Sequence, residues 1–138
     1  MSIGVSFPGG KRVDAQVGDF VIRTDQSPRG GGEGSAPEPF ALFLASLATC
    51  AGVYVLGFCQ ARDLPTEGLA LAQHHRFDPL TGKLEAVEIE VTLPPGFPAK
   101  YRDAVLQAAA GCKVKKVLHD PPDIVVRAVE SPERVPVA

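Results

Sequence analysis

The sequence lacks tryptophan and asparagine, and it has no segment that resembles a secretory signal. Its first residues, MSIGVSFPGGKRV, contain no apolar core after a basic start, so we expect a cytoplasmic protein. The net charge of −2 shows no excess of the basic residues that bind nucleic acid or anionic membrane surfaces. We therefore expect neither nucleic acid nor a membrane as a partner.

Several familiar site motifs are also missing. The sequence has no GxSxG, P-loop or GxGxxG pattern, and the stretch GGGEG does not lie directly between a strand and a helix. No CxxC, HxxxH or HExxH spacing indicates a metal site, and the adjacent His74 and His75 would point to opposite faces of a strand. We therefore expect no cofactor and no metal ion.

Length and composition are typical of a globular domain. The chain has 138 residues, of which 45% are hydrophobic and 22% are charged. These values are compatible with a well-packed core and argue against disorder. We expect residues 1–138 to form a single domain.

The periodic segments predict an α+β fold with mostly antiparallel strands. Helices are expected from about Pro39 to Arg62 and in AKYRDAVLQAAAG and CKVKKVLHD. Ser35 or Glu38, at the end of the loop QSPRGGGEGSAPEP, could cap the first helix. Strands are expected in RVDAQVGDFVIRTD, which is broken at Gly18, in LALAQHHRF, in KLEAVEIEVTL and in DIVVRAVE.

The first helix contains an uncharged run from Phe40 to Cys59, which is long enough to cross a bilayer. Polar residues such as Ser46 and Thr49 dilute its hydrophobicity, and no basic anchor precedes it, so a buried helix of a soluble protein is favoured. A helix that is apolar all round needs cover on every side, which so small a chain can hardly supply. We therefore expect a homodimer with these helices at its centre.

The three cysteines differ in their surroundings. Cys50 and Cys59 are nine residues apart, which places them on opposite faces of the helix and prevents a bridge between them. Cys59 is best interpreted as a small buried hydrophobe. Cys112 opens a short helix that is rich in lysine, where it is either a reactive thiolate or an ordinary residue at a capped turn. His119 follows two turns later, so a Cys-His pair for acyl transfer is a weaker alternative.

Four features of the sequence together resemble the OsmC/Ohr family, the osmotically inducible and organic hydroperoxide resistance proteins. They are the glycine-rich loop, the run APEPF, the Ala-Thr-Cys that ends at Cys50, and Cys112 with the lysines and the Pro-Pro that follow it. The resemblance extends from roughly Thr24 to Glu130. It implies an intertwined α+β homodimer in which antiparallel sheets surround central long helices, with two sites at the interface.

The resemblance also implies a reaction. Cys50 matches the thiol that attacks a peroxide, Cys112 matches the thiol that resolves the product, and Arg29 matches the family's arginine within one position. The expected function is reduction of organic hydroperoxides or hydrogen peroxide as part of a stress response. The reaction would proceed through a sulfenic acid and then a disulfide between the two cysteines. A cellular dithiol would reduce this disulfide.

One position departs from the family pattern. The family's glutamate should stand at Ala41, which leaves Glu38 or Glu33 as the acids that could pair with the arginine. The missing acid keeps a second function open: an OsmC-fold protein without catalysis that binds a small apolar ligand at the dimer interface. Phe40 and Phe43 would contribute an apolar lining in either case.

Overall fold

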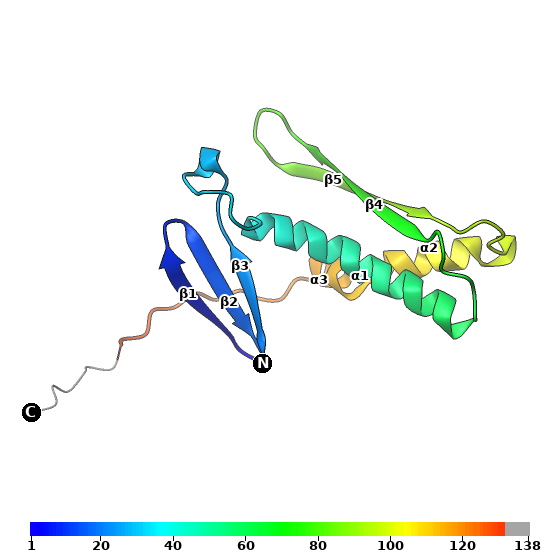
Figure 1. Ribbon diagram of the computed structural model, residues 1–138, viewed down its shortest axis with the longest axis horizontal. Coiled ribbons are helices and arrows are strands. Elements are labelled where there is room, and N and C mark those ends of the chain that lie inside the picture. Colours follow the sequence, from blue (N-terminus) through cyan, green and yellow to red (C-terminus); the bar gives the residue numbers. More distant parts are fainter. Residues whose placement is uncertain (132–138) are drawn as a thin grey trace, which may run out of the picture.

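Two separate antiparallel sheets and a long central helix organise residues 1–131, the part of the chain that the computed structural model describes (Figure 1). The N-terminal sheet has the strand order β1 (Ile3–Gly9), β2 (Arg12–Val17) and β3 (Phe20–Thr24). The second sheet is the hairpin of β4 (Ala70–Phe77) and β5 (Leu84–Thr92). The predicted α+β class is confirmed.

Strand β1 is an element that the sequence-based prediction missed. It alternates Ile3, Val5 and Phe7 with smaller residues, and this period of two is the signal that could have found it. The register aligns Val5 with Ala15 on β2 and, through Ala15, with Ile22 on β3. Apolar side chains from all three strands therefore share one face of this sheet.

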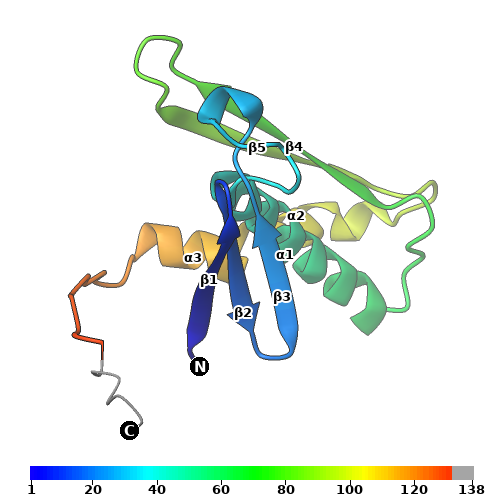
Figure 2. The same cartoon turned by 60° about the vertical axis from the view of Figure 1, so that its left-hand side comes forward.

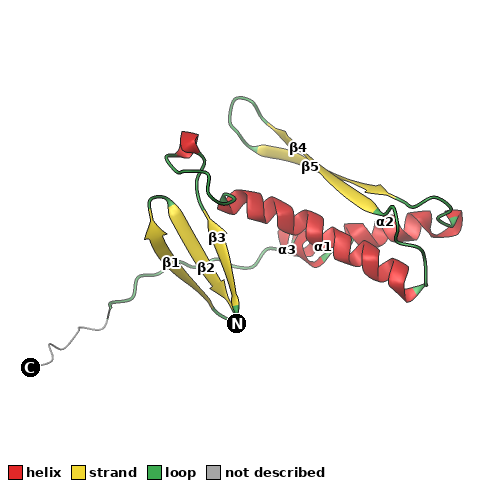
Figure 3. Cartoon of the chain, viewed as in Figure 1, coloured by secondary structure: helices red, strands yellow, loops and turns green. Residues whose placement is uncertain are grey.

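Helix α1 (Pro39–Ala61) confirms the predicted long helix and forms the centre of the core. Every fourth residue of one stripe is buried, from Leu47 to Cys59. This stripe packs against α2 (Arg102–Ala110) and the inner face of the β4–β5 hairpin. Figure 3 shows α1 beside both elements. By length and composition α1 could cross a membrane, and 22% of its most apolar 18 residues are buried, along the stripe that packs on the core.

The remaining helices follow α1 in the chain and pack beside it. The short 3₁₀ turn Ala99–Tyr101 leads into α2, which ends at Gly111 as predicted. Helix α3 (Lys113–His119) begins directly after Cys112 and also contacts α1. The order of elements thus brings the two cysteine-bearing segments, α1 and the start of α3, into one packed unit (Figure 2).

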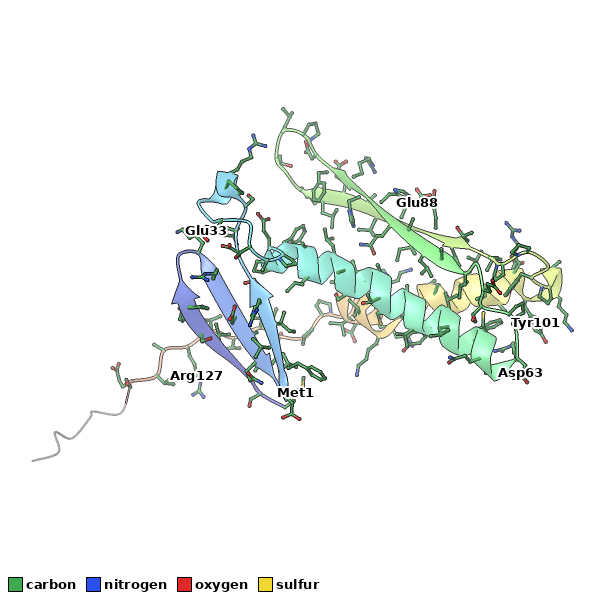
Figure 4. The ribbon with its side chains drawn as sticks, in the orientation of Figure 1. Met1, Glu33, Asp63, Glu88, Tyr101 and Arg127 are labelled. Atoms are coloured by element: carbon green, nitrogen blue, oxygen red, sulfur yellow. The ribbon has the colours of Figure 1, made fainter. Side chains whose placement is uncertain are left out.

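The predicted strand DIVVRAVE is wrong for a single chain. Residues 121–131 contain neither strand nor helix, and four apolar side chains there are between 76% and 93% exposed: Ile124, Val125, Val126 and Val129. Figure 4 shows Arg127 on this extended segment. A strand requires a neighbour whose backbone groups pair with its own, and within residues 1–131 this segment has none.

Candidate functional site

The two cysteines of α1 lie on opposite sides of the helix, as their spacing predicts. Cys59 is fully buried in the stripe that packs on the core, which agrees with a packing role. Cys50 lies on the other side and is partly exposed, as reactive cysteines commonly are. All three cysteines of the chain are free thiols.

Cys112 is the N-cap of α3 and is only 2% exposed. Its backbone is extended, with φ −62° and ψ 150°, and its carbonyl accepts a hydrogen bond of 3.1 Å from the amide of Lys116. The side chain makes no capping hydrogen bond. The thiol is therefore held at the first turn of a helix, with lysines close in sequence, but it is shielded from bulk solvent.

Cys112 lines a cavity of about 640 Å³ between α1, β5, α2 and α3. Its walls are mainly apolar, and its polar lining comes from Glu85, Lys115 and His119. Leu47 lines the same cavity, and Cys50 follows Leu47 by about 4.5 Å along the helix axis and about 60° around it. The cavity can hold an apolar molecule with a polar end beside Cys112, close to the helical turn that bears Cys50.

The loop between β3 and α1 is built around the carboxylate of Asp25, which is 1% exposed. This carboxylate accepts hydrogen bonds from the hydroxyl of Ser35 at 2.6 Å and from the amides of Ser35 and Gln26 at 3.0 and 2.8 Å. The Ser35 hydroxyl, followed by the amide of the same residue, lowers the pKa of Asp25 from 3.8 to about 2. Sequence analysis missed Asp25, because its partners are distant in sequence and follow no periodic pattern.

The side chains of Glu38 and Ser35 do not serve the open amides at the start of α1, so the prediction of a side-chain cap is wrong. Glu38 is the N-cap residue, but its carboxylate accepts a hydrogen bond of 3.0 Å from the amide of Ser27. The Ser35 hydroxyl donates to Asp25 instead. Both side chains are engaged by the loop backbone and its buried acid, so the loop competes with the helix for them.

The structure does not bring Arg29 to Cys50 within one chain. Arg29 lies in the exposed 3₁₀ turn η1 (Pro28–Gly30), beyond the N-terminal end of α1 in Figure 1, and within residues 1–131 its side chain forms no hydrogen bond or ion pair. Cys50 is 11 residues into the helix from Pro39, or about 16.5 Å along its axis. Because η1 lies beyond the start of the helix, the backbone of Arg29 is farther from Cys50 than an arginine side chain can reach.

Comparison with known protein families identifies the family of this chain. Residues 32–127, more than half of the chain, match the family described as OsmC-like protein. The chain belongs to this family. No curated protein matches the sequence.

Solved structures support the OsmC-like fold. A Psychrobacter arcticus protein described as an osmotic stress induced and detoxification response protein has a TM-score of 0.72 at 21% identity, over 84% of this chain and 86% of that one. An OsmC-like protein from Mycoplasma pneumoniae has a TM-score of 0.68 at 14% identity, over 87% of both chains. An organic hydroperoxide resistance protein from Legionella pneumophila has 0.57 at 16%, over 85% and 87%. At these identities the likeness shows the fold alone.

The OsmC-like chain has no acid in the first turn of α1. Ala41 occupies the position expected for the family's glutamate and is exposed. Glu38, three residues earlier, points to the amide of Ser27, and Glu33 lies in the loop, as Figure 4 shows. Among the described residues, the carboxylate of Glu38 is held by a hydrogen bond and that of Glu33 is not. Neither acid forms an ion pair there.

Sequence analysis also missed a cluster that joins β4 to the first half of α1. The rings of Phe40 and Phe43 are 5.7 Å apart, and the ring of Phe77 is 6.5 Å from that of Phe40. The side-chain amide of Gln73 donates to the carbonyl of Leu44 at 2.8 Å, and it lies 2.7 Å from a ring nitrogen of His75. The alternation of residues 73, 75 and 77 in β4 is the signal that could have predicted their shared face.

The imidazoles of the OsmC-like chain do not form a metal site in the described region. His74 points to the face of β4 opposite His75 and lies 3.3 Å from Glu90. Residues 1–131 contain no group of three or more histidine, cysteine or acidic side chains that could hold a metal ion. His119 lines the same cavity as Cys112, but no hydrogen bond joins these two side chains within the described chain.

The low pKa of Asp25 predicts an acid-dependent loss of stability. Because the folded-state pKa of about 2 lies below the unfolded value of 3.8, the ionised carboxylate stabilises the fold above about pH 4. This contribution is lost as the pH falls from about 4 to about 2. We expect Asp25→Asn to lower Tm at neutral pH and the difference from wild type to shrink across this window. A difference that stays constant down to pH 2 would contradict the assignment.

Proposed function

We propose that this OsmC-like chain is a thiol-dependent hydroperoxide reductase that acts in the defence of the cytoplasm against peroxides. The observation that supports it most is the pair of free thiols on packed elements, with Cys50 partly exposed and Cys112 at a mainly apolar cavity. The name of the Legionella relative, an organic hydroperoxide resistance protein, points in the same direction. Residues 1–138 would act as one domain.

The proposed cycle begins with the thiolate of Cys50. It attacks one oxygen of the peroxide, the O–O bond breaks, and the other oxygen leaves as an alkoxide that takes up a proton. Cys50 is thereby oxidised to a sulfenic acid while the peroxide is reduced to an alcohol. The thiol of Cys112 then attacks the Cys50 sulfur, so a disulfide forms and water leaves. A cellular dithiol reduces this disulfide by thiol exchange and is itself oxidised.

Arg29 would pair with the Cys50 thiolate and stabilise the departing alkoxide, because a guanidinium stays charged even when it is partly desolvated. Since Arg29 cannot reach Cys50 of its own chain, we propose that the partner in a homodimer supplies it. Two exposed apolar surfaces support a dimer. One is the face of the N-terminal sheet, with Phe7 and Phe20, and the other is the side of α1 that includes Val53. A monomer would leave both in water.

Organic hydroperoxides suit this chain better than hydrogen peroxide does. The cavity beside Cys112 has mainly apolar walls, and Phe40 and Tyr54 are exposed on α1. An apolar substituent on the peroxide would gain free energy on leaving water, whereas hydrogen peroxide has no such group. We therefore expect kcat/KM to be higher for an organic peroxide, mainly through a lower KM.

The direct test is peroxide consumption by the purified, reduced protein. Cumene hydroperoxide or tert-butyl hydroperoxide should disappear catalytically when a dithiol is supplied, and hydrogen peroxide should disappear more slowly. The cysteines must first be shown to be reduced by thiol titration. If several peroxides and several reductants give no turnover with intact thiols, the proposed function is wrong.

Cys112→Ser tests the resolving step separately. We expect this variant to turn over more slowly than wild type with a dithiol reductant, because the dithiol itself must then reduce the Cys50 sulfenic acid, which has no partner thiol within the protein. Dimedone should label Cys50 in the variant, whereas wild type treated with one equivalent of peroxide should form a disulfide. Mass spectrometry distinguishes the two products. Turnover of the variant at the wild-type rate would remove Cys112 from the cycle.

The cavity and Ala41 favour one other function, a binding protein without a peroxidase cycle. In that case a small apolar ligand would occupy the cavity of about 640 Å³, and Cys50 would behave as an ordinary thiol. The rate at which iodoacetamide alkylates Cys50 between pH 6 and 9 separates the two functions. A rate equal to that of a free thiol across this range, together with saturable binding of an apolar fluorescent probe, would favour the binding protein.

A further inference from the structure

The loop of residues 25–38 closes around a buried acid that the proposed reaction does not use. One carboxylate oxygen of Asp25, Oδ1, accepts a hydrogen bond from the Gln26 amide. The other, Oδ2, accepts from the amide and hydroxyl of Ser35 and, at 3.4 Å, from the amide of Glu33. These bonds connect the end of β3 to residues 8 and 10 positions further along. The carboxylate therefore holds the two sides of the loop together.

The loop backbone leaves no room for a side chain at Gly32. A Cβ atom at this position would lie 2.7 Å from Oδ1 of Asp25 and closer still to the carbonyl oxygen of Gln26. The amide of Asp25 also donates to the carbonyl of Pro37 at 3.2 Å, so the two ends of the loop meet just before α1. Contacts this close require that residue 32 be glycine.

The segment that Asp25 closes contains both polar residues assigned to the site by sequence. Arg29 lies at the tip of the loop in η1, and Glu38 lies at its end, where its carboxylate accepts from the Ser27 amide. Neither side chain forms a hydrogen bond or ion pair with Asp25 within residues 1–131, so the acid acts on them through the loop backbone. A side chain at the tip of an open loop would sample many positions, whereas a closed loop restricts it.

We propose that Asp25 is a positioning residue: its carboxylate fixes the 25–38 loop in one shape and thereby sets where Arg29 and Glu38 are presented. The consequence for catalysis rests on the proposed function, but the effect on the loop does not. Removing the charge of Asp25 should loosen the loop around Arg29 without unfolding the sheets or helices. The chain offers a close control in Asp78, an acid in another loop that accepts hydrogen bonds from the amide of Leu80 and the hydroxyl of Thr81.

The rate of trypsin cleavage reports how readily the loop opens, because the Arg29–Gly30 bond is a cleavage site within it. In the full-length protein, Asp25→Asn should raise the cleavage rate at Arg29 by at least about tenfold relative to cleavage at Arg76 in β4, which reports global unfolding. Asp78→Asn should leave that ratio unchanged. Hydrogen exchange should show the same contrast at the amides of Glu33 and Ser35. An unchanged ratio in Asp25→Asn would overturn the proposal.

Two further variants guard against a general loss of folding. Ser35→Ala removes one hydrogen bond to Asp25 and keeps the backbone amide, so it should raise the cleavage ratio at Arg29 less than Asp25→Asn does. Gly32→Ala keeps every charge but displaces the backbone from Asp25, and it should match Asp25→Asn. If Arg29 and Arg76 become sensitive together in all three variants, Asp25 supports the whole fold and does not act locally, and the proposal fails.

Peroxidase kinetics test whether the loop acts through Arg29. Asp25→Asn should reduce kcat/KM on the order of 10²-fold, mainly in kcat, because a misplaced guanidinium stabilises the transition state poorly. In an Arg29→Ala background the same substitution should have almost no further effect on kcat/KM. Equal losses in both backgrounds would overturn the route through Arg29. If the wild type has no peroxidase activity, the proposed function fails, and the cleavage ratio still decides whether Asp25 holds the loop.

Discussion

Replacing Cys50 with serine is expected to abolish peroxide turnover, with a loss in kcat/KM of at least about 10³-fold. A serine hydroxyl is not ionised at neutral pH, and it cannot pass through a sulfenic acid and a disulfide. Cys50 is partly exposed, so the substitution should leave the core intact and change Tm little. Steady-state consumption of cumene hydroperoxide, measured beside a thermal melt, checks both expectations.

Cys59→Ala is the matched control, since it removes a thiol from the same helix on its opposite side. Cys59 is fully buried, so this variant should lose some stability through the small cavity that it creates. Its kcat/KM should remain within about twofold of wild type, because the side chain lies away from the exposed side of α1. Turnover that survives in Cys50→Ser but is lost in Cys59→Ala would reverse the roles assigned to the two thiols.

Local geometry explains why the sequence could predict the contrast between these cysteines. A rotation of 100° per residue places Cys50 and Cys59 on opposite faces of any regular helix, whatever surrounds it. Local signals also located β2 to β5 and the three helices, because periodicity, composition and the residues that start or stop an element are properties of each segment alone. The closing strand DIVVRAVE failed for the converse reason, since a strand also needs an edge to pair with.

The loop residues of the site were harder to predict. The hydrogen bonds of Asp25 join positions 8 and 10 residues apart in a stretch without periodicity, so only the folded backbone reveals them. Glu38 was assigned by sequence to a helix cap or to the arginine, yet its carboxylate binds the Ser27 amide. In our proposal, Arg29 reaches Cys50 from a second chain. The sequence of one chain does not show how two chains align.

Replacing Val53 with glutamate is expected to dissociate the proposed homodimer. Val53 is 66% exposed on the side of α1 opposite the core, although the helix bears no charge along this stretch. A carboxylate forced into an apolar interface would lose its hydration without a partner charge, which should weaken dimerisation on the order of 10²- to 10³-fold. Light scattering should find wild type at twice 14.5 kDa and the variant shifted towards a single chain.

Leu80→Glu provides the control for this experiment. Leu80 is 94% exposed in the turn between β4 and β5, outside the two apolar surfaces assigned to the interface, so a charge there should leave the mass of the assembly unchanged. Dissociation should also reduce peroxide turnover in Val53→Glu at low protein concentration, because Arg29 would then be absent from the site. A wild-type mass of 14.5 kDa with full activity would contradict both the dimer and the supply of Arg29 by a partner.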